Sequence, residues 1–143
     1  MNMSARKFFV SWIVSSLLMF GLSYLWHGVL LNDFNRLSYP KGIFFIVASI
    51  VYLIIGFAVV KVYTLKIFEK VSGKMTIRGL VAGALCGVVF YMIAMVVGIS
   101  FSTELKIQYI ALDMAWQAME QGVGGMAVAV VGIWIHDYLP EDF

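Results

Sequence analysis

Four long apolar stretches alternate with short polar segments along the chain. An α-helix needs about 20 mostly apolar residues to cross the ~30 Å hydrocarbon core of a bilayer, so each stretch can span a membrane. The stretches cover about residues 8–31, 43–60, 79–100 and 107–135. The pattern predicts an all-α integral membrane protein with a single domain over residues 1–143, a bundle of four transmembrane helices. The last stretch exceeds one crossing, which predicts a tilted helix or one that emerges from the membrane.

The composition supports this class and excludes several others. Hydrophobic residues make up 62% of the chain and charged residues 13%, whereas soluble domains are about 45–50% apolar and about 25% charged. A disordered chain, a nucleic-acid binder and a typical soluble enzyme are therefore excluded. The first stretch is too long for the core of a signal peptide and no A-x-A cleavage site follows it, so we expect a retained helix.

The basic residues predict the orientation, because Lys and Arg concentrate on the cytoplasmic side of membrane proteins. Seven lie before the first stretch or between the second and third, and three lie on the other face. The seven are Arg6, Lys7, Lys61, Lys66, Lys70, Lys74 and Arg78. We therefore expect both termini in the cytoplasm. Residues 61–78 fit a basic loop better than an amphipathic helix on the inner leaflet, although their spaced apolar residues are compatible with the latter.

Small residues predict where helices pack closely. The third stretch begins with Gly79, Gly83 and Gly87, a repeated small-xxx-small spacing that allows another backbone to approach. An internal helix contact explains this spacing better than a dimer interface in a four-helix chain. The fourth stretch carries a seam of small residues at alternating steps of four and three, which forms one stripe on a helix. Its central members are Ala118, Gly122 and Gly125.

Polar residues form a second stripe on the fourth stretch. Asp113, Gln117, Glu120 and Gly124 also step by four, three and four, and their mean direction is roughly opposite the small seam. This side should not face lipid, so it must meet a polar interior, a water-filled cavity or another subunit. The last setting predicts a homo-oligomer or another membrane subunit as partner, beside the membrane lipid itself.

Glu120 lies near the predicted membrane midplane. A carboxylate at that depth costs about 2.5–3.5 kcal/mol on insertion scales, so it should be paired, hydrated or protonated. Two interpretations stay open for it: a proton or cation relay or ligand contact, and a structural hydrogen bond to a Ser or Tyr on another helix. For Asp113, nearer the outer end, the structural interpretation is favoured.

His27 lies in the first stretch at about the depth of Asp113. The depth allows a His27–Asp113 contact, with Tyr24 or Tyr91 as other candidates. His136 lies at the opposite end of the fourth stretch, so the two histidines cannot hold one haem together. Because the chain has one cysteine and two distant histidines, a closed zinc site is not expected. We predict no metal and no cofactor.

The chain resembles small, uncharacterised four-helix membrane proteins of bacteria that are grouped in families of unknown function. Three places carry the resemblance: Trp26 before an exit segment containing Phe34, Arg78-Gly79 at the start of the third stretch, and Asp113-Met-Ala-Trp116 in the fourth. The resemblance implies the same fold and a bacterial cytoplasmic membrane, and it brings no activity. The chain departs from the families' patterns at His27 and Glu120.

Three functions are compatible with these sequence features. The sequence favours a non-enzymatic accessory or oligomeric membrane subunit, since it contains no visible catalytic constellation. The first alternative is a small proton-linked transporter or channel-like protein that uses Glu120. The second is a lipid- or quinone-handling enzyme with Asp113 and His27 as an acid–base pair.

Overall fold

The protein is helical throughout the part that the computed structural model describes, which is residues 3–36, 40–71, 73–99 and 107–135. In chain order the elements are α1 (Ala5–Ser23), a π-helix η1 (Tyr24–Leu30), a 3-10 turn η2 (Asp33–Arg36), α2 (Lys41–Tyr63), α3 (Lys66–Glu69), α4 (Met75–Ile99) and α5 (Ile107–Trp134). The predicted all-α class is confirmed. His136 lies outside the described residues.

Three of these helices are long and apolar enough to cross a membrane. They are Ala5–Leu30, Lys41–Tyr63 and Met75–Val96. Their outward side chains are apolar, as lipid requires: Leu17, Ile46 and Val96 are 65%, 65% and 67% exposed. A water-facing surface of this kind would be unusual, because large exposed apolar patches mark contact with another apolar phase.

The helices extend beyond the apolar stretches that predict them. The second was predicted over 43–60 and covers Lys41–Tyr63, and the third was predicted from residue 79 and begins at Met75. Lys41 and Lys61 lie at the ends of α2, and lysine favours helix nearly as well as leucine does. Arg78, in the first turn of α4, is buried with its guanidinium over the Tyr63 ring. The hydropathy pattern therefore predicts the apolar part of each helix but not where the helix begins and ends.

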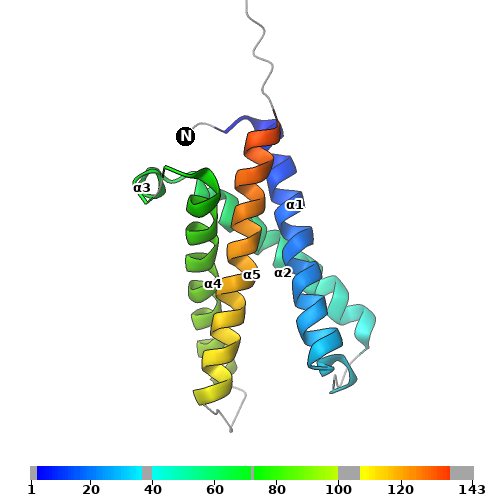
Figure 1. The fold of residues 1–143 in the computed structure, drawn as a ribbon. Coiled ribbons are helices and arrows are strands. Elements are labelled where there is room, and N and C mark those ends of the chain that lie inside the picture. The colour runs from blue at the N-terminus through cyan, green and yellow to red at the C-terminus, as the bar shows by residue number, and fades with distance from the viewer. Residues whose placement is uncertain (1–2, 37–39, 72, 100–106, 136–143) are drawn as a thin grey trace, which may run out of the picture.

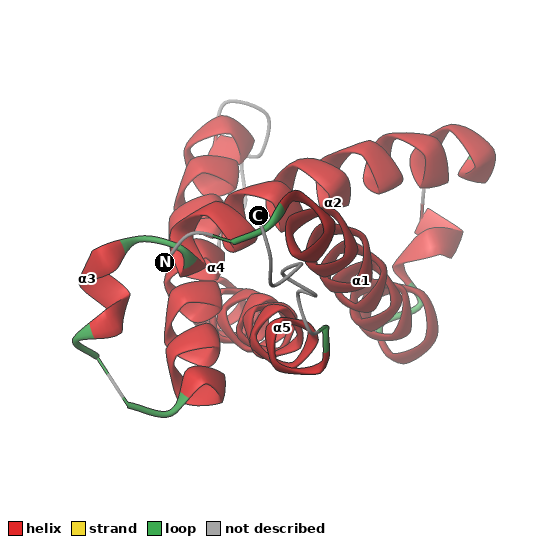
Figure 2. Cartoon of the chain, turned by 90° about the horizontal axis from the view of Figure 1, so that it is seen from above, coloured by secondary structure: helices red, strands yellow, loops and turns green. Residues whose placement is uncertain are grey.

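The chain folds as two helical hairpins, α1–α2 and α4–α5, and the helices of the second hairpin are antiparallel (Figure 1). The start of α1, the end of α5 and the short α3 lie at one end of the bundle, which we call the terminal end. η1, the start of α2 and the start of α5 lie at the other, the distal end. α1 and α5 lie side by side, whereas α2 is strongly oblique to both (Figure 2).

The α4–α5 hairpin is closed by glycine. Three glycines of α4 touch the backbone of α5 so closely that a Cβ on any of them would overlap a carbonyl group. The pairs are Gly79 with Gly125, Gly83 with Gln121 and Gly87 with Gln117. Gly122 of α5 meets Leu80, and the Ala118 backbone lies beside Gly87. The small residues of both helices thus form a contact inside one chain, which stabilises membrane helices through close packing.

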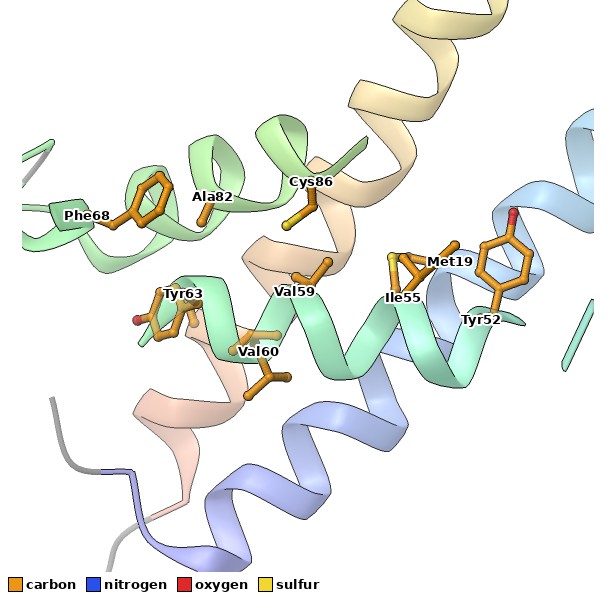
Figure 3. Packing of buried hydrophobic residues seen from close by; sticks show 11 residues of the cluster. Met19, Tyr52, Ile55, Val59, Val60, Tyr63, Phe68, Ala82 and Cys86 are labelled. Atoms are coloured by element: carbon orange, nitrogen blue, oxygen red, sulfur yellow. The ribbon is translucent and has the colours of Figure 1, made fainter. Parts of the chain in front are cut away.

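The two hairpins join through a hydrophobic core near the terminal end (Figure 3). Val59 and Val60 of α2, Ala82 of α4, and Val128 and Ala129 of α5 are fully buried there. Ile55 and Tyr52 lie nearer the start of α2, toward the distal end, where α2 lies away from α4. The terminal end is therefore packed solid, and open volume in the bundle lies toward the distal end.

Candidate functional site

Gly124, on the polar side of α5, packs against α1. A Cβ on Gly124 would meet the side chains of Met19 and Ser15, and the Ser15 hydroxyl donates a hydrogen bond of 3.0 Å to the Gly124 carbonyl. Glu120 and Gln121, one turn away, are fully buried. This part of the polar side is therefore covered by α1 of the same chain, and it needs no second subunit.

Glu120 is fully buried inside the bundle. The Trp116 indole Nε1 donates a hydrogen bond of 3.1 Å to Glu120 Oε2, and the Tyr52 hydroxyl of α2 lies close to the same carboxyl group. The other carboxyl oxygen, Oε1, has no hydrogen-bond partner among the described residues. A buried polar atom without a partner is uncommon in folded proteins and indicates a functional position or a buried water.

Trp116 also makes an aromatic contact between the two hairpins. Its ring is stacked on Trp26 of η1, with centroids 4.2 Å apart and planes 11° from parallel. These two tryptophans are among the residues that carry the resemblance described above. Trp116 thus makes two contacts: its ring stacks on Trp26 of η1, and its N–H donates a hydrogen bond to Glu120.

A cavity of about 550 Å³ lies between α2, α4, α5 and η1. Apolar side chains such as Val51, Ile55 and Ile93 form most of its wall. Six side chains with polar atoms line it as well: His27, Tyr52, Tyr91, Asp113, Trp116 and Gln117. A mostly apolar cavity with a few converging polar groups is the usual form of a small-molecule site.

A second cavity of about 510 Å³ adjoins the first on the side of α1 and η2. The two share His27, Val51, Tyr52 and Gln117 as lining residues. The second cavity adds Ser23 and Asp33 as polar groups. The sequence-predicted site residues His27, Asp113 and Gln117 therefore meet at one place. Glu120 does not line either cavity and is linked to them through Trp116 and Tyr52.

His27 contacts Asp33 and not Asp113. The imidazole Nδ1 lies 3.0 Å from Asp33 Oδ2, so the structure does not show the His27–Asp113 contact that equal depth allows. The cause is a chain reversal after η1: Asn32 adopts a left-handed conformation with φ 55, which turns η2 back toward the helix. Helical-wheel reasoning assumes a straight helix and cannot anticipate this reversal.

We expect a double-mutant cycle on His27 and Asp33 to give a coupling energy of about 0.5–1 kcal/mol, because the side chains touch and remain partly exposed. His27→Ala and Asp33→Asn are measured singly and together by unfolding in detergent. The cycle on His27 and Asp113 is the matched comparison and should give a smaller coupling energy, because these side chains share a cavity without touching. A larger coupling to Asp113 than to Asp33 would contradict the observed pairing.

Two residues of the site were not predicted. The link from Trp116 to Glu120 follows the i, i+4 spacing of neighbours on a helix, so a search for polar partners along α5 would have found it. Tyr52 carries no such signal, since it reaches Glu120 only because α2 crosses the bundle obliquely.

No family model, curated protein or solved structure matches this chain. The resemblance to bacterial four-helix families stays a prediction. Within the described part of the chain, no group of three or more His, Cys, Asp or Glu side chains could hold a metal ion. The cavity, Trp116 and Glu120 are therefore the features of the structure that indicate a function.

Proposed function

We propose that the protein is a four-span membrane carrier that binds a hydrophobic molecule in the distal cavities and exchanges a proton at Glu120. The observation that carries the proposal is the double role of Trp116. It lines the first cavity and donates to the Glu120 carboxyl group. A ligand that displaces the indole removes the donor from the carboxyl group, and a change at the carboxyl group repositions the wall of the cavity.

The proposed fourth span is α5, with both termini in the cytoplasm of a bacterial cell. Its 28 residues extend about 42 Å, enough to cross a bilayer. Its polar residues lower its hydropathy, but Glu120 and Gln121 are buried inside the bundle and so avoid lipid. The placement of the seven basic residues supports the cytoplasmic orientation, because α1 starts and α5 ends at the terminal end.

The size and lining of the cavities support a small hydrophobic ligand. Volumes of about 550 and 510 Å³ lie within the roughly 300–1,000 Å³ of typical ligand sites. Exposed apolar side chains of α2 and α4, including Ile54 and Ile93, stand at the edge of the first cavity. A hydrophobic molecule dissolved in lipid would meet the site there without first entering water.

The carrier interpretation now outranks the accessory subunit that the sequence favours. That hypothesis depends on a polar side of α5 that another subunit would cover. In the structure, α1 covers the part around Gly124, and the cavity accounts for Asp113 and Gln117.

The proposal is tested in proteoliposomes that contain the full chain and a trapped pH indicator, with K⁺ and valinomycin to remove the membrane potential. Three probes of similar shape are added to separate samples: tetraphenylphosphonium, tetraphenylborate and the neutral triphenylphosphine oxide. We expect at least one probe to accelerate proton flux above that of empty vesicles.

Glu120→Gln should return this flux to the rate of empty vesicles, because the amide does not ionise near neutral pH and so cannot carry a proton. Ala94→Trp, which places a ring in the first cavity, should do the same. Glu69→Gln on α3, a carboxyl group far from the cavity, is the matched control and should keep wild-type flux. Wild-type flux in Glu120→Gln, or no probe-dependent flux in the wild type, would overturn the proposal.

A further inference from the structure

The charges around the distal cavities are predominantly acidic. Asp113 lines the first cavity and Asp33 lines the second, with the His27 imidazole between them. No lysine or arginine is among the described residues that line either space. Lys41, at the start of α2, donates to Asn35 and does not contribute to either wall.

Asp113 is the carboxyl group best placed to meet a ligand. Asp33 already contacts His27 at 3.0 Å, and Glu120 is held by Trp116 behind the wall. Asp113 forms no salt bridge within the described ranges. The His27 imidazole lines the same cavity but contacts Asp33, so it acts on Asp113 only at longer range. A carboxylate at membrane depth without a cation is costly, so a positively charged ligand would remove an existing penalty.

Aromatic side chains complete a setting that favours a cation. Phe90, Tyr91, Tyr52 and Trp116 all line the first cavity. A delocalised or alkylated cation is attracted to the faces of such rings by about 0.5–2 kcal/mol, most strongly where water is excluded. An anion would meet the same faces and the Asp113 carboxylate with repulsion.

We propose that the ligand is a lipophilic cation, such as a quaternary ammonium, a phosphonium or a protonated hydrophobic amine, and that Asp113 is the residue that selects its charge. This inference rests on the proposed binding of a hydrophobic molecule in the cavity and names its chemical class. Apolar walls accept the organic groups of the cation, while Asp113 and the aromatic faces meet its charge.

The test is equilibrium binding to the purified full chain in an uncharged detergent, which requires no transport. Tetraphenylphosphonium and tetraphenylborate have nearly the same shape and opposite charges, and triphenylphosphine oxide is neutral. We expect the cation to bind about tenfold more tightly than either other probe, which corresponds to 1.4 kcal/mol. Asp113→Asn should remove this preference, Asp113→Glu should retain it, and Glu69→Gln should leave it unchanged.

The outcomes separate the ligand class from the function. Equal binding of the three probes, blocked by Ala94→Trp and insensitive to Asp113→Asn, would overturn the cation preference and leave a hydrophobic-ligand site. No binding of any probe above that of Ala94→Trp would overturn both. Asp113-dependent binding of the cation without proton flux in vesicles would support the ligand class and reject the carrier.

Discussion

Replacement of Gly83 by leucine is expected to separate α4 from α5 and to unfold the α4–α5 hairpin. A Cβ at Gly83 would overlap the Gln121 carbonyl group and lie 3.1 Å from the Gly122 Cα. These are backbone atoms of a helix, so they cannot move aside as a flexible side chain would. Lipid solvates apolar side chains as well as protein does, so no hydrophobic driving force holds α4 against α5. Their interface depends on close packing, which a side chain at Gly83 would prevent.

The expected loss is at least about 3 kcal/mol for leucine, and about 2 kcal/mol or more for alanine. It is measured as the midpoint of unfolding in a denaturing-detergent titration. Gly21→Leu and Gly132→Leu are the matched controls, because a Cβ at either position meets nothing within 4 Å. Removing a helical glycine there should be neutral or slightly stabilising. Equal midpoints for Gly83→Leu and Gly21→Leu would contradict the packing described for α4 and α5.

Trp116→Ala is expected to cause the second large loss, about 3 kcal/mol of stability together with all probe-dependent proton flux. It removes the ring stacked on Trp26 and the N–H that holds Glu120. Trp116→Phe separates the two contributions, because it keeps an aromatic ring and removes the donor. We expect Trp116→Phe to cost about 1 kcal/mol and still to lower flux strongly.

Detergent unfolding and vesicle flux are both measured for the two variants. A Phe variant with wild-type flux would show that the indole hydrogen bond does not link cavity and carboxyl group. A Trp26→Ala variant extends the test to the partner ring, and its coupling to Trp116→Ala should be about 1 kcal/mol, as for stacked aromatic pairs.

The sequence predicts the helical elements and the glycine spacing well, because both depend on local periodicity. A run of apolar residues defines a spanning helix regardless of its neighbours, and the spacing of Gly79, Gly83 and Gly87 marks a close approach wherever the partner lies. The polar stripe of α5 was also recognisable. What covers that stripe was not, since it depends on how α1 and α2 are placed against it.

The cavity and the partner of His27 lay beyond prediction for the same reason. The cavity exists because α2 is oblique and lies away from α4 at the distal end. The His27–Asp33 contact exists because the backbone reverses at Asn32. Neither the crossing angle of two helices nor a reversal at a single asparagine leaves a periodic signal along the chain.

The two hairpins pack through the hydrophobic core at the terminal end. At the distal end cavities lie between them and the Trp26–Trp116 stack joins them. The contact between Ser15 and Gly124 joins the two hairpins. From Gly124, about 25 Å of α5 extends to the start of the helix at the distal end. A rotation of about 5° at this contact would therefore widen the distal end by about 2 Å, which would part the stacked Trp26 and Trp116 rings. The glycine contacts between α4 and α5 stay intact in such a movement because they lie wholly within one hairpin. Because each hairpin moves as a rigid unit, a small rotation at the Ser15–Gly124 contact would produce a larger change in the separation of the hairpins at the distal end.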